Sequence, residues 1–357
     1  MKGRAPFLAC LTAAWLVWGT AEARAAGPTL DIYWIDVEGG AATLIVTPAK
    51  QAILIDTGWA IGPSAARIHA AAEEAGVRRI DYLILTHFHL DHYGGAAGLA
   101  ALMPIGVVFD NGIPDRNPDG LFDGGAFAVM IQPYRDFKAE RRVVIEPGQA
   151  IPLWQLGGTA PLSFRCMGAR RHFVHVAKET PNPLCGGGTD HAADTTDNKN
   201  SVISLLQFGL FKFFDGGDLT WNAEKELVCP VNSIGQVDVY QVDHHGTELS
   251  NNPLLVRSLA PTVSVMDNGP RKGGGAATLA TLRGVSSIRT MYQLHRDLRG
   301  GKEYNTDDPF IANVNEKCAG NYIKCSVDPS GKSYTISIPA TGFAQTYQTR
   351  TAGAGNP

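Results

Sequence analysis

The stretch Thr86-His87-Phe88-His89-Leu90-Asp91-His92 places three imidazoles and one carboxylate within six positions. It directly follows the apolar run Tyr82-Leu83-Ile84-Leu85, whose composition predicts a buried strand. Because side chains alternate along a strand, the first two histidines can point toward one ion, while Asp91 and His92 on the following turn can reach a second point nearby. Imidazole and carboxylate donors suit Zn²⁺, Mn²⁺ or Fe²⁺, and a set without thiolate favours a hydrolytic metal over a structural one. We therefore predict a metal site at this position.

Three other stretches end apolar runs with acidic residues or histidines. Residues 52–58 end in Asp-x-Gly, in which Asp56 is the acidic residue. Residues 211–219 contain Gly-Gly-Asp-Leu, in which Asp218 follows the glycines. Residues 237–247 contain the tripeptide His-His-Gly.

In this order, the motifs resemble those of the metallo-β-lactamase fold superfamily, whose first metal motif is H-x-H-x-D-H at the end of a strand. The resemblance extends over roughly residues 30 to 300. It implies an α/β fold of the four-layer αββα sandwich type. It also implies that Asp218 bridges two ions, that Asp56 supports the site from outside the ligand set, and that His245, or alternatively His244, supplies the last histidine. The metal ligands implied by the resemblance are His87, His89, Asp91, His92, Asp218 and His245.

One position departs from the pattern of most family members. They carry a further histidine on the strand before Gly-Asp, where this chain has Asn200 within the stretch Asp197-Asn198-Lys199-Asn200-Ser201. This combination resembles a narrower branch, the hydrolase domain of the DNA-uptake protein ComEC and its free-standing relatives. An amide oxygen is a weaker zinc donor than imidazole, so the first metal would be held less tightly or would take a water instead. His191, in a polar loop nearby, could substitute as a ligand, although a solvated loop histidine is the simpler interpretation.

Hydrophobic periodicity gives a coarse outline that agrees with this fold. An antiparallel opening of three strands is expected first, and helices and strands then alternate. Strands are expected at 30–36, 42–47, 51–56, 80–85, 201–208, 211–215, 237–242, 262–266 and 287–293, and helices at 64–75 and from Gly95, Asn252 and Ala276. Between about residues 111 and 199 the periodicity fails, which predicts a loop-rich insertion that covers the metal site.

Residues 1–25 have the features of a signal peptide. A basic start precedes an apolar run over residues 6–18, and Ala23-Arg24-Ala25 offers a small-x-small cleavage site. We expect cleavage after Ala25, a single metallo-β-lactamase-like hydrolase domain over residues 26–357, and a periplasmic or secreted location. The apolar run is short for a membrane span, and no other segment is long and apolar enough.

Cysteine usage fits an oxidising compartment. Without Cys10, five cysteines remain. Cys318 and Cys325 bracket a short loop and are the first expected disulfide, and Cys166 with Cys185 is the second. A cysteine metal cluster is not expected, because the sequence contains no C-x-x-C spacing.

The net charge of the chain limits which binding partners are expected. Removal of residues 1–25 would lower the basic residues from 31 to 28 and the acidic residues from 34 to 33, which leaves a net charge of about −5. A nucleic-acid surface is normally basic, so nucleic acid is not indicated, and a small molecule or phosphoester is the expected partner. Arg271 and Lys272, in a glycine-rich turn after an expected strand, are the cations best placed for an anionic substrate. The sequence leaves the oligomeric state open.

Together these features predict hydrolysis assisted by one or two Zn²⁺ ions, with Mn²⁺ or Fe²⁺ as alternatives. A metal-bound water with a pKa lowered toward about 7 would attack carbon or phosphorus. Asp91 would also orient that water, and His295, at the end of a late strand, would protonate the leaving group. The residues expected to contact substrate are Asn200, Arg271 and Lys272.

The ComEC-like details favour a phosphodiester or a related phosphoester as the substrate. A lactone or ester is the alternative, and a β-lactam is disfavoured because the third-strand histidine is missing. A metal-stabilised binding protein without catalysis is a hypothesis of a different class. An intact ligand set argues against it, since a chain relieved of catalysis need not keep an open metal site.

Overall fold

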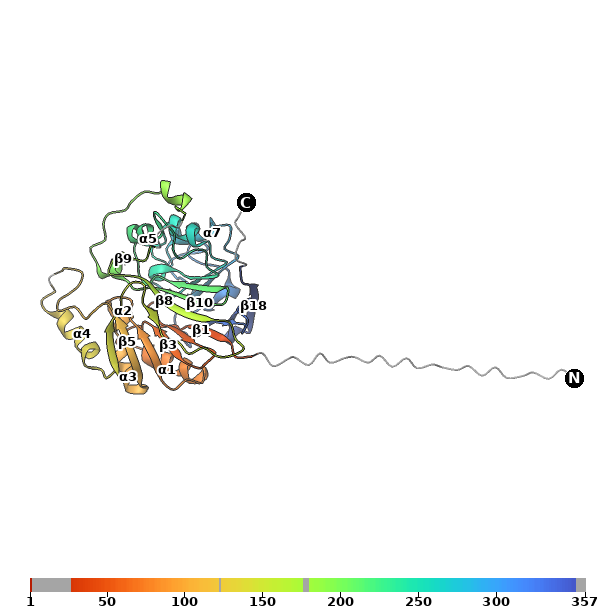
Figure 1. Cartoon of the computed structure of the whole chain (residues 1–357), viewed down its shortest axis with the longest axis horizontal. Helices are drawn as coiled ribbons and strands as arrows, with labels where there is room; N and C mark the ends of the chain where they lie inside the picture. Colours follow the sequence, from red (N-terminus) through yellow and green to blue (C-terminus); the bar gives the residue numbers. More distant parts are fainter. Residues whose placement is uncertain (2–26, 122, 176–179, 351–357) are drawn as a thin grey trace.

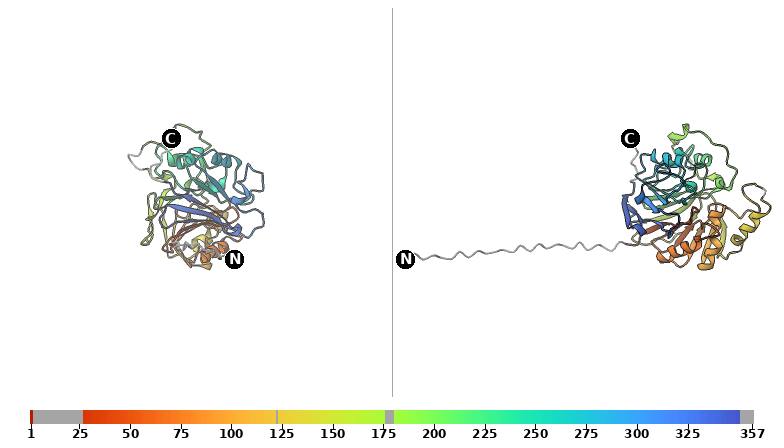
Figure 2. Two further views of the ribbon diagram at one scale, coloured as in Figure 1. Left: turned by 90° about the vertical axis from the view of Figure 1, so that its right-hand side faces the viewer. Right: turned by 180° about the vertical axis from the view of Figure 1, so that it is seen from behind.

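The computed structural model describes residues 1, 27–121, 123–175 and 180–350. The expected signal peptide and its cleavage after Ala25 fall outside the described residues, as does Cys10. Two large β-sheets stack face to face, and helices cover the outer face of each one (Figures 1 and 2). The chain therefore has the four-layer αββα arrangement that the sequence predicted.

The first sheet, sheet A, combines the beginning of the chain with its last strands. Within the described residues it has nine strands in the order β18-β17-β16-β1-β2-β3-β4-β5-β6. Strands β1, β2 and β3 pair antiparallel, as expected, whereas β3 to β6 pair parallel. The strands are β1 Leu30–Trp34, β2 Thr43–Val46, β3 Ala52–Ile55, β4 Ile80–Ile84, β5 Ile105–Asp110, β6 Arg141–Val144, β16 Ile323–Val327, β17 Ser333–Ile338 and β18 Phe343–Gln348.

The second sheet, sheet B, has the order β15-β14-β13-β12-β11-β10-β8-β7, and β9 pairs with β8. Strands β11 to β15 are parallel to one another, whereas β7, β8, β10 and β11 pair antiparallel. The strands are β7 Ala150–Ile151, β8 Leu162–Ala169, β9 His172–Phe173, β10 Ile203–Phe208, β11 Phe211–Asp215, β12 Val239–Gln241, β13 Val263–Met266, β14 Thr290–His295 and β15 Ile311–Asn313.

The helices lie on the outer faces of the two sheets. Figure 1 shows α1, α3 and α4 below sheet A and α5 and α7 above sheet B. The helices are α1 Ser64–Glu74, α2 Leu90–Tyr93, α3 Ala96–Leu102, α4 Ala126–Asp136, α5 Trp221–Val228, α6 Pro253–Leu259 and α7 Ala276–Arg283. The short 3₁₀ turns are η1 Pro183–Gly186, η2 Asp197–Asn200, η3 Asp243–Gly246, η4 Asp308–Phe310 and η5 Pro339–Thr341.

The core has three layers of apolar side chains because each central strand is buried on both faces. In β1, Leu30, Ile32 and Trp34 point between the sheets, whereas Tyr33 points toward the helices that cover sheet A. A third cluster joins sheet B to α5, α6 and α7. This burial explains why the strands read as continuous apolar runs in the sequence rather than as alternating ones.

The expected insertion over residues 111–199 is not a loop throughout. It contains α4 and the strands β6 to β9, and β8 pairs with β10 along its length. The pattern of β8 was hidden because only its first half alternates buried with exposed residues and its second half is fully buried. The sequence outline also omitted β5 and the four strands from β15 to β18, three of which complete sheet A.

Both expected disulfides are wrong. The described chain joins Cys185 of η1 to Cys229, which follows α5, and the two Cα atoms lie 5.8 Å apart. Cys325 of β16 points into the core between the sheets, whereas Cys318 lies in a loop, and Cys166 is buried on β8. Sequence spacing did not reveal that β16 turns Cys325 inward, away from the neighbouring loop. No helix in the described residues is long and apolar enough to cross a membrane.

Candidate metal centre

The predicted metal motif lies where strands from both sheets end at one edge of the sandwich. Strand β4 leads into Thr86–His92, and β11 and β12 lead into Asp218 and η3. Two glycines allow these ends to approach closely. A Cβ atom on Gly216 would lie 2.5 Å from Asp243 Oδ1, and one on Gly217 would lie 2.9 Å from the Thr86 Cβ. The Gly-Gly-Asp sequence is therefore required for Asp218 to reach the first motif.

Four donors from these segments form a compact group, here called the Asp91 cluster: Asp91, His92, Asp218 and His245. Their donor atoms all lie within 4.8 Å of one another, and all four side chains are buried. His92 Nε2 lies 3.2 Å from Asp218 Oδ2, and His245 Nε2 lies 3.3 Å from Asp91 Oδ2. Tetrahedral zinc ligands at about 2.0–2.1 Å are separated by about 3.3 Å, so the donors already have a spacing that suits an ion.

The ring nitrogens that face this group are unpaired. His87, His92 and His245 each bury an Nε2 atom without a hydrogen-bond partner in the described part of the chain. An unpaired buried polar atom costs about 1–3 kcal/mol, unless a ligand satisfies it. The unpaired nitrogens therefore fit a divalent metal ion bound among these residues.

The opposite ring nitrogens of His87 and His92 have hydrogen-bond partners, as is typical of metal-binding histidines, whereas that of His245 lies within ion-pair distance of a carboxylate. His92 Nδ1 lies 2.7 Å from Asp56 Oδ2, and Asp56 also accepts hydrogen bonds from the backbone N–H and the hydroxyl of Thr86. His87 Nδ1 lies 3.0 Å from the Thr86 hydroxyl, and His245 Nδ1 lies 3.3 Å from Asp267 Oδ1. Asp56 thus lies behind His92, as the resemblance implied, and Thr86 and Asp267 were not anticipated.

The electrostatics of the group suit cation binding. Burial raises the pKa of Asp91 and of Asp218, but neighbouring imidazoles, His92 foremost, outweigh it and hold both values well below the ordinary range. Burial, reinforced by His92, lowers the pKa of His87 well below its usual value, so this imidazole is neutral and able to bind a metal. Burial and Lys272 lower the pKa of His245, but Asp218 and Asp267 outweigh them and raise it to about 9.

The turn η3 brings both candidate histidines of the third motif to Asp218. His244 Nε2 lies 3.4 Å and His245 Nε2 lies 3.6 Å from Asp218 Oδ2. Both residues have left-handed backbone conformations, with φ of 55° and 53°, which cost about 1–3 kcal/mol each for residues other than glycine. His245 also contacts Asp91, whereas His244 contacts Asp218 from outside the Asp91 cluster. The structure therefore places the two candidate histidines differently: His245 belongs to the Asp91 cluster, and His244 lies beside Asp218 without belonging to it.

The remaining histidines of the first motif lie differently from one another. His87 Nε2 lies 3.9 Å from Asp218 Oδ2, and His87 is not a member of the Asp91 cluster. His89 instead places its Nε2 3.0 Å from Asp119 Oδ1. Asp119 belongs to the stretch interpreted as an irregular loop, and no sequence pattern predicted this contact. Among the predicted ligands, His89 is therefore the one that the structure turns toward another partner.

The asparagine beside the metal centre is Asn198, and Asn200 faces elsewhere. Asn200 donates its side-chain N–H to Asp197 Oδ1 at 2.9 Å. Asn198 Nδ2 lies 3.4 Å from His244 Nε2, and Asn198 Oδ1 is buried without a hydrogen-bond partner among the described residues. The assignment of Asn200 is wrong because Asn200 lies in η2, before β10 begins at Ile203, and this turn directs its side chain at Asp197.

The two cations predicted to contact substrate, Arg271 and Lys272, lie in different surroundings. Lys272 contacts the Asp91 carboxylate, donates to the Gly39 carbonyl at 2.7 Å, and lies over the Trp59 ring at 4.9 Å. Arg271 is exposed and pairs with Glu316 at 2.8 Å. The structure therefore brings Lys272 to the metal centre, but it does not bring Arg271 there.

His295 does not lie at a pocket rim, which corrects the expected role as proton donor. It ends β14, is fully buried, and places Nε2 2.8 Å from Asp36 Oδ1. It belongs to a second group, here called the Asp36 cluster, in which Arg67 donates to Asp36 at 2.8 Å and to Glu38 at 2.9 Å. The donors of the Asp36 cluster are Asp36, Glu38, His295 and Cys318. Strand-end position alone did not reveal that the imidazole turns inward.

The fold and the unpaired donors define an αββα protein with a candidate metal centre. Residues 35–151 match the family model described as the Metallo-beta-lactamase superfamily. The chain carries a metallo-beta-lactamase superfamily domain, as its motifs suggested.

Three relatives illustrate the similarity. Recombination protein 2 of Haemophilus influenzae is 26% identical over 68% of this chain and 24% of its own length. Competence protein ComA of Neisseria gonorrhoeae is 23% identical over 65% of this chain and 26% of its own length. Thioesterase pkgB of Emericella nidulans is 31% identical over 31% of this chain and 30% of its own length. The match thus covers less than a third of each relative, and the first two are consistent with the ComEC-like branch.

Proposed function

We propose that the protein is a metal-dependent hydrolase that uses a zinc-activated water on a phosphodiester or a related phosphoester. The Asp91 cluster is the observation that carries the proposal, because four buried donors of the right type converge there with unpaired imidazole nitrogens. The superfamily domain supports the hydrolase class. Zinc is the proposed ion, in one or two copies, and Mn²⁺ or Fe²⁺ would suit the same donors.

The number of ions that the site can hold depends on the metal donors that surround Asp218. Asp91, His92, Asp218 and His245 are the donors for one ion. His87, His244 and Asp218 are the donors closest to a position for a second one, and His89 would join them by leaving Asp119. The donor set for the second ion is less complete, so we propose weaker binding there.

The protein residues would prepare the reaction in the following way. When bound, a divalent ion supplies hydroxide by lowering the pKa of a coordinated water from about 15.7 toward about 7. Asp91, which stays ionised because its pKa is held well below the usual range, would accept a hydrogen bond from that water and orient it. Asp56 would keep His92 directed at the site. The Lys272 ammonium beside Asp91 would attract an anionic phosphoryl group.

The substrate class rests on two kinds of support. The names Recombination protein 2 and Competence protein ComA fit a phosphodiester, and Lys272 supplies a cation at the reacting position. A lactone or ester hydrolase is the second candidate, which the name of Thioesterase pkgB favours. A non-catalytic binding protein remains the third proposal.

We also propose that the protein is exported. The sequence of residues 1–25 favours export, and the disulfide between Cys185 and Cys229 is of a kind that persists mainly in oxidising compartments.

The proposal is tested with protein purified metal-free and reloaded with zinc or manganese. Bis(p-nitrophenyl) phosphate, a lactone and a β-lactam are compared for the metal-loaded protein, the metal-free protein and the variants Asp91→Asn and Asp136→Asn. Asp136 is an exposed aspartate of α4 and serves as the control. We expect phosphodiester turnover that requires metal and Asp91 but not Asp136. Faster lactone opening would favour the second candidate, and metal binding without turnover of any substrate would favour the third.

A further inference from the structure

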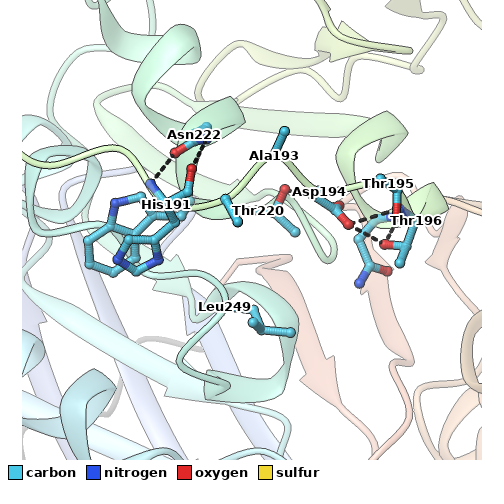
Figure 3. Close-up of a pocket in the computed structure, with 11 residues that line it drawn as sticks. His191, Ala193, Asp194, Thr195, Thr196, Thr220, Asn222 and Leu249 are labelled. Carbon is cyan, nitrogen blue, oxygen red and sulfur yellow. Dashed lines mark hydrogen bonds between the residues drawn. The ribbon is translucent and has the colours of Figure 1, made fainter.

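A recess of about 270 Å³ adjoins the metal centre on the side of His244. Three segments line it, and each one leads to the site. Asn198 lies next to His244, Trp221 follows Asp218 by three positions, and Leu249 follows His245 by four. Figure 3 shows His191 at one end of the recess, Asp194 and Thr196 toward the other, and Leu249 below them. The recess is therefore placed to hold a part of the substrate that extends from the reacting bond.

The walls of the recess are mainly apolar. His191 stacks on Trp221 with ring centroids 3.9 Å apart and an interplanar angle of 10°. Leu249 is a large apolar side chain that is 63% exposed, and Ala192 and Ala193 line the recess as well. Aromatic faces and an exposed leucine favour an apolar or aromatic group, because its burial removes apolar surface from water on both partners.

The lining offers no cation within the described residues. Its carboxylate, Asp194, is already satisfied, since Oδ1 accepts from the N–H and hydroxyl of Thr196 and Oδ2 accepts from the Thr220 hydroxyl at 3.2 Å. Trp221 donates its indole N–H to the Thr189 carbonyl at 2.9 Å. A nucleic-acid strand is held by Lys and Arg along its phosphates, which these walls do not provide.

One polar group in the recess lacks a partner. Asn198 is only 6% exposed, and its Oδ1 atom is buried without a hydrogen-bond partner in the described part of the chain. Its other amide atom faces His244. If the oxygen and nitrogen were exchanged, the nitrogen would lack a partner instead, so one amide atom of this lining residue is unpaired among the described residues in either orientation.

We propose that this recess binds an uncharged aryl or alkyl substituent of the substrate, and that the Asn198 amide hydrogen-bonds to a polar atom between that substituent and the reacting bond. This inference rests on the proposed function and narrows it. The substrate is a small phosphoester with one bulky apolar group, and it is not a polynucleotide strand.

The test compares two anions that share a metal-binding group and differ in the substituent. Phenylphosphonate and methylphosphonate are titrated into zinc-loaded protein by calorimetry. We expect phenylphosphonate to bind at least about tenfold more tightly, since burial of a ring removes apolar area from water. A short single-stranded oligothymidylate should not displace it.

Two variants remove apolar walls, and each has a matched control. Trp221→Ala and Leu249→Asn should reduce the preference for phenylphosphonate to about threefold or less. Trp154→Ala and Leu210→Asn alter exposed residues that do not line the recess and should keep the full preference. Leu249 lies in an exposed loop, so its variant tests the inference even if Trp221→Ala fails to fold.

The titrations distinguish a failure of this inference from a failure of the proposed function. If neither phosphonate binds to the zinc-loaded protein, the proposed metal-dependent function fails. If both bind with equal affinity, or if the two recess variants keep the preference, the recess does not bind the substituent and the proposed function stands. Displacement of phenylphosphonate by the oligothymidylate at micromolar concentration would overturn the inference in favour of a nucleic-acid strand.

Discussion

The Asp91 cluster and the Asp36 cluster contain similar donors but differ in how those donors are paired. Both combine histidine with carboxylates after buried strands, and in both the donor atoms lie within 4.8 Å of one another. In the Asp36 cluster, Arg67 bridges two carboxylates, and His295 places Nε2 2.8 Å from Asp36. In the Asp91 cluster, the imidazole Nε2 atoms have no hydrogen-bond partner among the described residues.

This difference teaches that donor identity and proximity do not by themselves define a metal site. In the Asp36 cluster the two carboxylates and His295 Nε2 are paired, so an ion bound by these atoms would have to displace existing contacts and an arginine cation. In the Asp91 cluster, the buried Nε2 atoms of His92 and His245 lack hydrogen-bond partners among the described residues, and Lys272 places a cation beside Asp91. The unpaired atoms identify the centre, and five experiments can sharpen or break the contrast.

The largest expected effect concerns Asp218, which contacts donors on both sides of the centre. Asp218→Asn should remove at least one equivalent of metal and reduce hydrolysis at least about 10³-fold, because the metal-activated water is lost with the ion. Elemental analysis and turnover of bis(p-nitrophenyl) phosphate provide the measurements. Asp115→Asn, at an exposed position, is the control. Full metal content and activity in Asp218→Asn would contradict the assignment.

The second effect concerns the Arg67 ion pairs that hold the Asp36 cluster together. Arg67→Met should lower the free energy of unfolding by about 3–5 kcal/mol, because it leaves the buried carboxylate of Asp36 without its cation. Denaturation in urea measures the loss. The metal bound at the Asp91 cluster should not change. An unaltered stability would show that the arginine does not hold this cluster together.

The third effect is a pH dependence of metal binding. In the metal-free protein His245 has a pKa of about 9, so below that pH an ion must expel a proton from it. Asp91 and Asp218 are already ionised and require no such exchange. Zinc affinity should therefore rise by at least about tenfold per pH unit between pH 6 and 8, as measured by competition with a chelator. A flat profile would indicate that His245 is not a ligand.

The fourth effect concerns the cation beside the centre. Lys272→Met should tighten zinc binding by up to about tenfold, because the ammonium that contacts Asp91 repels the ion. Arg271→Met, which alters an exposed neighbour paired with Glu316, should have no effect. Weaker zinc binding in Lys272→Met would show instead that the lysine orients Asp91.

The smallest effect separates the two asparagines. Asn198→His should increase metal retention several-fold, since imidazole is a better zinc donor than an amide and this position lies beside His244. Asn200→His should leave retention unchanged, because Asn200 is directed at Asp197. Chelator titration of both variants measures metal retention. Stronger retention in Asn200→His than in Asn198→His would support the sequence-based assignment of Asn200 instead.

Much of the fold could be predicted because the strands near the metal motifs are short, apolar and separated by glycine or polar turns. Strands such as β4 and β11 were predicted within one residue, since their ends coincide with the metal motifs. The strands β16 to β18 were missed because they follow the last motif, although β16 and β17 alternate buried with half-buried residues. The pairing of β16 with β1, on which β17 and β18 build, depends on contacts between the two ends of the chain, which local sequence does not show.

The candidate site was predictable where a motif fixes the local backbone. The spacing of Asp91 and His92 brought both into one cluster, and Gly-Gly-Asp brought Asp218 to them. The position of Asn198 was not predictable, because it depends on η2 rather than on a strand. His295 and Arg271 were misplaced for a similar reason. Tertiary partners decide the side-chain direction of His295 at a strand end and of Arg271 in a turn, Asp36 for the first and Glu316 for the second.

The most direct test of the central claim is the metal content of three proteins purified in parallel: the wild type, His92→Ala and His295→Ala. Both histidines are fully buried next to carboxylates, but His92 Nε2 has no hydrogen-bond partner among the described residues, whereas His295 Nε2 lies 2.8 Å from Asp36 Oδ1. Elemental analysis should find at least one equivalent of zinc in the wild type, its loss in His92→Ala and its full retention in His295→Ala. Retention in His92→Ala together with loss in His295→Ala would contradict the account.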